Sequence, residues 1–296
     1  MKMISKIAIS LPLAAAIFFM QSARADAVSA HKAYFGVLYA KGFDVASDMR
    51  STVAKDTLVN GVYKVTSQDG GQFHAYISEN GQIFGDAVNG WQYTGSNIAL
   101  SGEEKFFLKV EVLHNIAVNK MIKVQYGDGG GRKMILLSSV DCPFCKKMEA
   151  NLAQHADMLN TTFYVLPAAL NGRDNTASAL QQWDTTARIW CANDNAAAWK
   201  NYWARRLVPD AKQCGMDSIA ARSLQRDFDE IMRSIWIRTT GSPAIIREDG
   251  KVFTPAPQFD VTQAESQYGK SALKEIGEVY TMSTIPLRFL GKPSSR

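Results

Sequence analysis

Residues 134–152 read MILLSSVDCPFCKKMEANL, a sequence that combines an apolar run, two cysteines and a helix-compatible segment. The apolar run at its start predicts a buried strand, and the residues after Cys145 predict a helix. Cys142 therefore stands at the predicted helix start, where unpaired backbone N–H groups and the positive end of the helix dipole stabilise a thiolate. Because a thiolate is the species that attacks disulfides, the C-x-x-C pair of Cys142 and Cys145 predicts thiol–disulfide chemistry.

The elements that follow this stretch extend the pattern. A second buried strand is predicted at residues 162–166, then a helical insert over about 170–237, a strand at 242–246, a turn, a short strand at 251–253 and a closing helix at 262–282. The thioredoxin fold has this order of elements: a strand, the CxxC, a helix, a strand, an insert and a final β-rich run. In that fold a cis proline lies opposite the CxxC, and the residue before it offers backbone hydrogen bonds to a substrate.

Ser242-Pro243 is the proline step in the right place for this role. A lone Gly-Ser-Pro is more commonly an ordinary turn. Its position before a β-rich run, downstream of the CxxC, favours the cis proline of the fold. We therefore expect Ser242 and Pro243 to lie in the substrate-binding loop, together with Pro143 and Phe144 between the two sulfurs.

A separate, small α+β unit is predicted at residues 26–98. One helix is followed by short strand signals at 62–66, 73–77 and 82–84, and Glu79-Asn80-Gly81 is a strong hairpin signal. Such a unit has little core of its own, so we expect it to bury surface against another subunit. Residues 99–131 predict a linker helix and a glycine-rich hinge, residues 132–282 the catalytic domain, and residues 283–296 a tail.

The first 25 residues predict an export signal. Lys2 and Lys6 precede an apolar stretch, and Ala23-Arg24-Ala25 supplies a small-x-small cleavage site. A membrane anchor is the alternative, but the stretch is short and Pro12 interrupts it. Removing the signal lowers the net charge from +5 to about +2. No long basic run remains, so nucleic acid is not an expected partner.

The four cysteines of this chain form two unlike groups. Cys142 and Cys145 are two residues apart, whereas 22 residues separate Cys191 from Cys214. A structural disulfide is the best interpretation of the second pair, and a loop of that size would stabilise the fold by roughly 3 kcal/mol. Neither the wide spacing nor the four scattered histidines fits a zinc site, so no metal and no cofactor are expected.

The chain resembles the periplasmic disulfide isomerases of the DsbC/DsbG family over almost the whole predicted mature sequence. The resemblance is carried by the CxxC, the Ser-Pro step, residues 76–81 and the segment Trp190-Cys191-Ala192-Asn193-Asp194 with Cys214 downstream. It implies a thioredoxin fold with a helical insertion, preceded by a small α+β (cystatin-like) dimerisation domain and a linker helix. It also implies that Cys191 and Cys214 form a second, non-catalytic disulfide.

The resemblance further implies a homodimer that shuffles disulfides in exported, cysteine-containing proteins and acts as a chaperone. A membrane thiol reductant of the DsbD kind would keep the site reduced. In that chemistry Cys142 attacks and Cys145 resolves the mixed disulfide.

Two departures from the family leave the direction of electron flow open. The active-site dipeptide is Pro-Phe, where DsbC has Gly-Tyr and DsbG has Pro-Tyr, and Ser242 stands where the family usually has threonine. The alternatives are a net disulfide oxidase of the DsbA kind and a redox-inactive chaperone or binding protein. The separate N-terminal unit argues against the first, and the intact Cys142 and Cys145 argue against the second.

Overall fold

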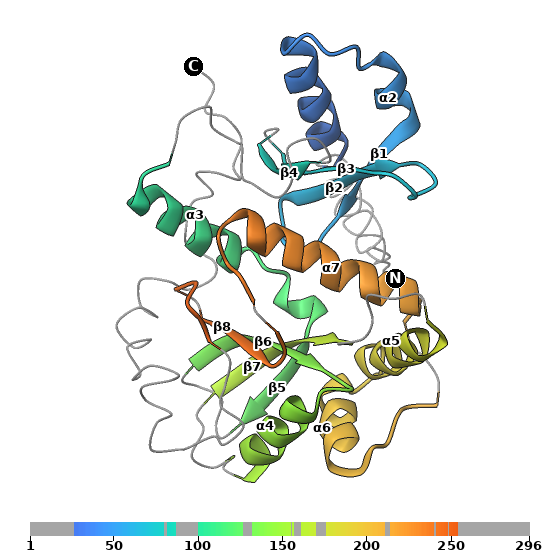
Figure 1. Cartoon of the computed structure of the whole chain (residues 1–296), viewed down its shortest axis with the longest axis vertical. Coiled ribbons are helices and arrows are strands. Elements are labelled where there is room, and N and C mark those ends of the chain that lie inside the picture. Colours follow the sequence, from blue (N-terminus) through green and yellow to red (C-terminus); the bar gives the residue numbers. More distant parts are fainter. Residues whose placement is uncertain are drawn as a thin grey trace, which may run out of the picture.

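Figure 1 shows the protein as a computed structural model. The structure describes residues 27–79, 82–86, 100–126, 132–154, 156, 161–169, 176–210, 214–239, 241–247 and 249–253. The predicted signal peptide, the glycine-rich hinge at 127–131, the closing helix at 262–282 and the tail at 283–296 lie outside these residues. None of the helices in the described part of the chain has both the length and the apolar character needed to span a membrane.

The N-terminal unit is one antiparallel sheet with helices beside it. A helix over residues 27–40 and the short α2 (Ala46–Ser51) precede a meander of four strands in the order β1-β2-β3-β4. The strands are β1 (Thr52–Asp56), β2 (Val62–Ser67), β3 (Phe73–Ser78) and β4 (Ile83–Asp86). The three strands expected from the sequence are present, and β1 is added at the edge. The turn at Asn80-Gly81 lies outside the described residues.

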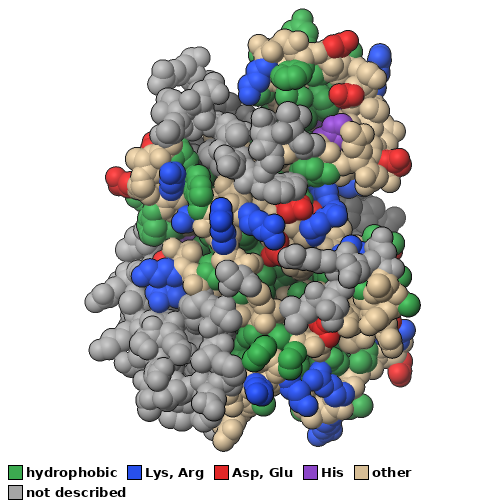
Figure 2. Space-filling model, in the orientation of Figure 1, with side chains coloured by type: hydrophobic (Ala, Val, Ile, Leu, Met, Phe, Trp, Pro, Cys, Tyr) green, Lys and Arg blue, Asp and Glu red, His purple; other side chains and the backbone are tan. Residues whose placement is uncertain are grey.

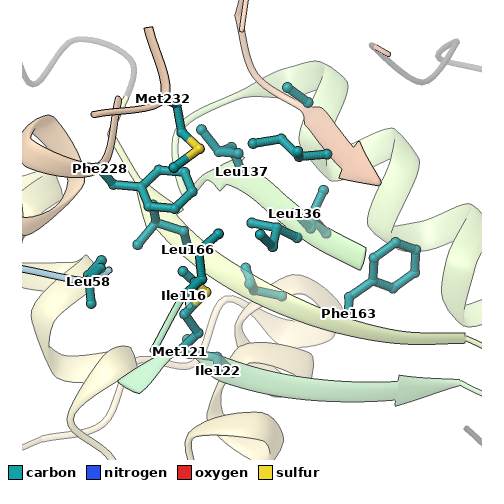
Figure 3. Close-up of a cluster of buried hydrophobic side chains, with 14 of the residues drawn as sticks. Leu58, Ile116, Met121, Ile122, Leu136, Leu137, Phe163, Leu166, Phe228 and Met232 are labelled. Carbon is teal, nitrogen blue, oxygen red and sulfur yellow. The ribbon is translucent and has the colours of Figure 1, made fainter. Parts of the chain in front are cut away.

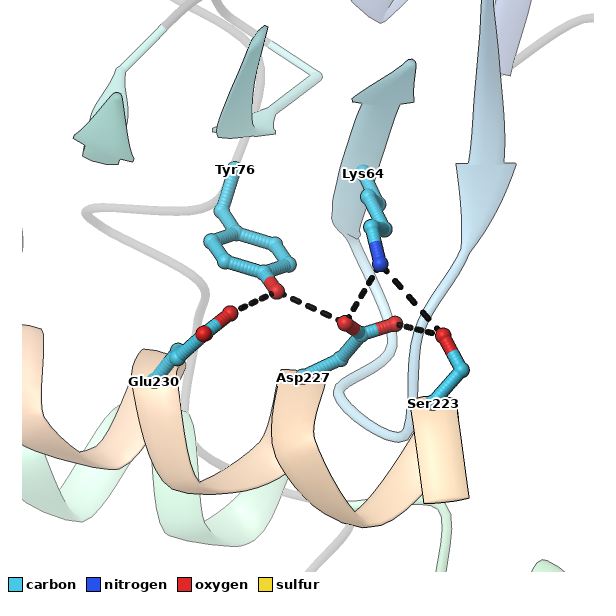
Figure 4. A network of polar contacts seen from close by, with 5 residues as sticks. All are labelled: Lys64, Tyr76, Ser223, Asp227 and Glu230. Atoms are coloured by element: carbon cyan, nitrogen blue, oxygen red, sulfur yellow. Dashed lines mark hydrogen bonds and ion pairs between the residues drawn. The ribbon is translucent and has the colours of Figure 1, made fainter. Parts of the chain in front are cut away.

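Both faces of this sheet are buried within the same chain. Tyr34 and Phe35 of the first helix pack on one face, against Val65 and Ile77. On the other face, Lys64 and Tyr76 contact α7 (Ser218–Ser234), a helix of the predicted insert (Figure 4). The second face is therefore covered by α7, where the sequence suggested a second subunit.

The helix α3 (Gly102–His114) connects the two halves of the molecule. It begins with a capping box, in which Ser101 accepts from the N–H of Glu104 and the Glu104 carboxylate accepts from the N–H of Ser101. At its other end, the N–H of Asn60 donates to the carbonyl of Asn115 and the N–H of Ala117 donates to the carbonyl of Leu58. These bonds fasten the loop after β1 to the end of α3.

The second half is built on a five-stranded sheet in the order β5-β7-β6-β8-β9. Its strands β6 and β7 are parallel, and every other neighbouring pair is antiparallel. This is the thioredoxin fold that the sequence predicts. The strands are β5 (Ile122–Tyr126), β6 (Arg132–Ser139), β7 (Thr161–Ala168), β8 (Ala244–Arg247) and β9 (Val252–Phe253).

Helices cover both sides of this sheet: α3 and α7 lie across one side, and α4 (Pro143–Gln154) and α6 (Asn195–Arg205) lie on the other (Figure 1). The predicted helical insert consists of α5 (Ala177–Trp190), α6 and α7. Figure 3 shows the main core, where Phe228 and Met232 of α7 lie over Leu137 and Leu166 of β6 and β7. The apolar run at residues 134–137 thus belongs to β6, the central strand of the sheet.

Candidate active site

The start of α4 holds Cys142 in a helix-capping position. The carbonyl of Cys142 accepts from the N–H of Lys146, and its Sγ accepts from the N–H of Cys145 at 3.2 Å. Pro143 occupies the first helical position, where a missing N–H costs nothing. The sulfur therefore receives a backbone donor and faces the positive end of the helix dipole, both of which favour a thiolate.

The loop before β8 closes over the two sulfurs. The peptide bond between Ser242 and Pro243 is cis. The Cys142 thiol donates to the carbonyl of Ser242 at 3.2 Å, and Ser242 Oγ lies 3.1 Å from Cys145 Sγ. The structure thus brings together residues that lie a hundred positions apart, and it places the four predicted residues Cys142, Cys145, Ser242 and Pro243 in one site.

Both cysteines are buried, with 1% of Cys142 exposed and none of Cys145. Cys145 is completely buried, and burial raises the pKa of its thiol to about 12, with its hydrogen bond to Cys142 adding to the effect. The N–H of Ser139 at 3.4 Å only partly opposes this shift. At neutral pH the Cys145 sulfur therefore keeps its proton and is a poor nucleophile. Both thiols are free in the structure.

Phe144, between the sulfurs, points away from the core. About half of its surface, 53%, is exposed, and its neighbour Pro143 is exposed as well. An exposed phenylalanine beside a reactive sulfur offers an apolar contact to an incoming polypeptide. Both side chains are therefore accessible, and their contact with substrate stays a prediction.

The turn before Cys142 is held by two residues that the sequence analysis did not single out. Tyr202 Oη donates to the carbonyl of Val140 at 2.7 Å, and Arg206 Nη1 donates to the same oxygen at 3.3 Å. The Arg206 guanidinium also stacks on the rings of Tyr202 and Trp203 at 4.8 and 4.9 Å. Arg206 ends α6 in the left-handed conformation, with φ of 58°, which directs its side chain back to the turn.

The side chain of Glu149 places a buried carboxyl group on the inner face of α4. Glu149 accepts from Trp199 Nε1 at 3.1 Å, from Tyr126 Oη at 3.3 Å and from Ser138 Oγ at 3.4 Å. Burial raises its pKa to about 7 in spite of these donors. One signal in the sequence could have revealed it, because Glu149 interrupts the apolar face formed by Met148 and Leu152.

Cys191 and Cys214 form a disulfide that is separate from the dithiol. It links the end of α5 to the segment before α7, with the two Cα atoms 5.0 Å apart. This separation is normal for a disulfide. The bond fixes the helical insert, of which α7 is the last part.

Residues 118–260 match the family model described as Thioredoxin-like domain. Among curated proteins, the chain is similar to a "Probable thiol:disulfide interchange protein DsbC" of Bordetella parapertussis, with 29% identity over 129 residues. The match covers 44% of this chain and 39% of that protein, so the chain spans about two fifths of the length of this relative.

Two solved structures are also similar. A disulfide interchange protein from Neisseria gonorrhoeae has 23% identity and a TM-score of 0.37, and the match covers 52% of this chain and 99% of that one. The DsbG of Helicobacter pylori has 12% identity and a TM-score of 0.32, with 69% and 97% covered.

Proposed function

We propose that this chain, whose residues 118–260 match a Thioredoxin-like domain, is a DsbC/DsbG-type protein that exchanges thiols and disulfides through Cys142 and Cys145. One observation carries the proposal: the Cys142 sulfur caps α4 while lying 3.2 Å from the carbonyl of Ser242. A helix start supports a thiolate, and the carbonyl before Pro243 marks where a substrate strand would lie.

The reaction we propose has two steps. The Cys142 thiolate attacks one sulfur of a substrate disulfide, forming a mixed disulfide and releasing the other substrate sulfur as a thiolate that takes up a proton. Either a substrate thiolate then displaces Cys142, which gives an isomerised substrate, or Cys145 does so, which gives a reduced substrate and a Cys142–Cys145 disulfide. Pro143, Phe144, Ser242 and Pro243 would form the surface on which the substrate lies.

The surroundings of Cys145 favour isomerisation over reduction. With its pKa raised to about 12, Cys145 is rarely a thiolate at neutral pH, so it resolves the mixed disulfide slowly. A slow resolving step gives a second substrate cysteine time to attack. A net oxidase, the alternative function, would instead need a site that rests oxidised, so the redox state of Cys142 and Cys145 in the isolated wild-type protein distinguishes the two functions.

Refolding of a scrambled, disulfide-bonded test protein measures this function. The reduced wild-type protein should restore the native disulfides, whereas Cys142→Ala should be inactive and Cys145→Ala should retain part of the isomerase activity. The matched control is the double variant Cys191→Ala, Cys214→Ala, which removes two sulfurs outside the site. Full refolding activity in Cys142→Ala would overturn the proposal.

We further propose a periplasmic location, with residues 1–25 as the export signal, exported cysteine-containing proteins as substrates and a DsbD-like membrane reductant as electron donor. Residues 26–98 would form the dimerisation domain, 99–131 the linker and 132–282 the catalytic domain.

Among the described strands of the N-terminal sheet, β1 and β4 are the outer ones, and strand edges can pair with a second copy. Light scattering coupled to size-exclusion chromatography should give twice the chain mass, and a monomer at all concentrations would contradict the homodimer.

A further inference from the structure

A polar cavity of about 430 Å³ adjoins the candidate active site. Gly241 and Ser242 of the proline loop form one part of its wall, and Ser139 of β6 forms another. Ser242 is the residue whose carbonyl lies 3.2 Å from Cys142 Sγ. The cavity therefore begins beside the carbonyl that contacts the proposed attacking sulfur.

One face of α7 forms the opposite wall. Arg222, Arg226, Asp229 and Arg233 line the cavity, and their spacing of four, three and four residues places them in a single row along the helix. The row from Arg222 to Arg233 is about 16 Å long, since a helix rises 1.5 Å per residue. About five residues of an extended polypeptide span the same distance.

The wall carries three arginines, Arg222, Arg226 and Arg233, against the two acidic side chains of Asp229 and Glu230. The Asp229 carboxylate accepts from Gln225 Nε2 at 2.5 Å, and the Glu230 carboxyl group, which also lines the cavity, is held by Tyr76. Burial raises the pKa of Glu230, and its hydrogen bond with Tyr76 and the charge of Arg226 oppose that shift. The side chains of Arg226 and Arg233 are exposed. Figure 2 shows Lys and Arg side chains, with some Asp and Glu among them, across the middle of the viewed surface, where α3 and α7 run in Figure 1.

We propose that this cavity is a subsite that selects substrates with an acidic side chain within about five residues of the cysteine under attack. Arg226 and Arg233 would bind the carboxylate, because a guanidinium presents several donors in a geometry that matches a carboxylate. The proposal rests on the proposed function, since it names the class of substrate for the same site. It makes Arg226 and Arg233 specificity-determining residues, and it leaves the chemistry at Cys142 unchanged.

The test uses two synthetic peptides of equal length, each carrying one cysteine as a mixed disulfide with thionitrobenzoate. One peptide has aspartate and glutamate near the cysteine, and the other has asparagine and glutamine there. The release of thionitrobenzoate by the reduced protein gives the rate constant. The acidic peptide should react about five- to tenfold faster at low ionic strength, and the preference should fade at high salt.

The variant Arg226→Gln, Arg233→Gln should lose this preference while its rate with the amide peptide stays unchanged. The control variant Lys32→Gln, Arg50→Gln removes the same charge from two exposed positions in the N-terminal unit and should keep the preference. Equal rates for both peptides in the wild type, or a preference that survives in the double arginine variant, would overturn the subsite.

A binding measurement separates this proposal from the proposed function. Labelled versions of both peptides with serine in place of cysteine cannot react, so fluorescence anisotropy reports their binding alone. Tighter binding of the acidic peptide, lost in the double arginine variant, supports the subsite even if no thionitrobenzoate is released. Absence of release from either peptide would contradict the proposed exchange reaction, and equal binding of the two unreactive peptides would contradict the subsite.

Discussion

Cys142 and Cys145 are chemically unequal although they share one turn of helix. Both sulfurs are buried and each accepts a backbone N–H, but Cys142 lies at the start of α4, whereas burial raises the pKa of the Cys145 thiol to about 12. We expect iodoacetamide at pH 8 to modify Cys142 far faster than Cys145, because only a thiolate reacts and Cys145 is almost wholly protonated. Peptide mapping by mass spectrometry checks this, and equal modification of the two cysteines would contradict the assigned roles.

Glu149 should make the stability of the fold depend on pH. Its pKa in the folded state, about 7, lies above the ordinary value of 4.5, so the folded state binds this proton more tightly than the unfolded state does. The stabilisation that the protonated Glu149 gives the folded state is complete below about pH 4.5, and it is lost as the pH rises to about 7. The free energy of unfolding should therefore fall by up to about 3 kcal/mol across this window from this group alone.

Denaturant unfolding of the variant Glu149→Gln tests this dependence. The variant keeps the shape of the side chain and cannot ionise, so its stability should fall less than that of the wild type between pH 5 and pH 8. The exposed Glu103 provides the control, and Glu103→Gln should follow the wild type. If Glu149→Gln shows the same pH dependence as the wild type, Glu149 does not titrate in this range.

At the scale of elements, α7 joins three parts of the molecule. One face carries Phe228, Ile231 and Met232 into the core, a second meets the N-terminal sheet, and a third carries the arginine row. The contact with the sheet is an ion pair of 2.6 Å between Lys64 Nζ and Asp227 Oδ1, with both side chains about nine-tenths buried. Tyr76 Oη donates to the same carboxylate at 2.7 Å.

Breaking this buried pair on one side should be costly. Lys64→Met leaves the Asp227 carboxylate without its cation, and we expect a loss of about 3 kcal/mol or more in the free energy of unfolding. Adding Asp227→Asn should recover part of the loss, because no uncompensated charge then remains. The exposed Lys32 gives the control, since Lys32→Met should change stability by less than about 0.5 kcal/mol. Additive losses for Lys64→Met and Asp227→Asn would show that the pair is not coupled.

The elements were predictable where local pattern decides them. The strand–CxxC–helix junction, the hairpins of the N-terminal sheet and the helical insert all follow from periodicity and turn residues. The strand β5 was not predicted, although Ile122, Val124 and Tyr126 alternate with two exposed residues as in a strand with one buried face. An alternation of only five residues gives a weak strand signal, and here it stands between a predicted helix and a glycine run.

At the scale of the whole molecule, contacts between distant segments decide what the sequence leaves open. Nothing local indicates that Lys64 and Tyr76 meet α7, or that Tyr202 and Arg206 support the turn before Cys142, because 60 or more residues separate the partners. The docking of the N-terminal sheet on α7 and the arginine-lined cavity are consequences of the tertiary fold. Through α7, the N-terminal sheet is thus connected to the cavity beside the candidate active site.

Capture of a mixed disulfide would show directly whether Cys142 is the attacking thiolate. The variant Cys145→Ala lacks the resolving cysteine, so it should accumulate mixed disulfides with cysteine-containing proteins. These adducts should be visible on non-reducing gels, and a thiol reductant should cleave them. The double variant Cys142→Ala, Cys145→Ala should form none, and mass spectrometry should place the linkage on Cys142. Adducts of equal yield in the double variant, or linkage through Cys191 or Cys214, would contradict the assignment of Cys142 as the attacking thiolate.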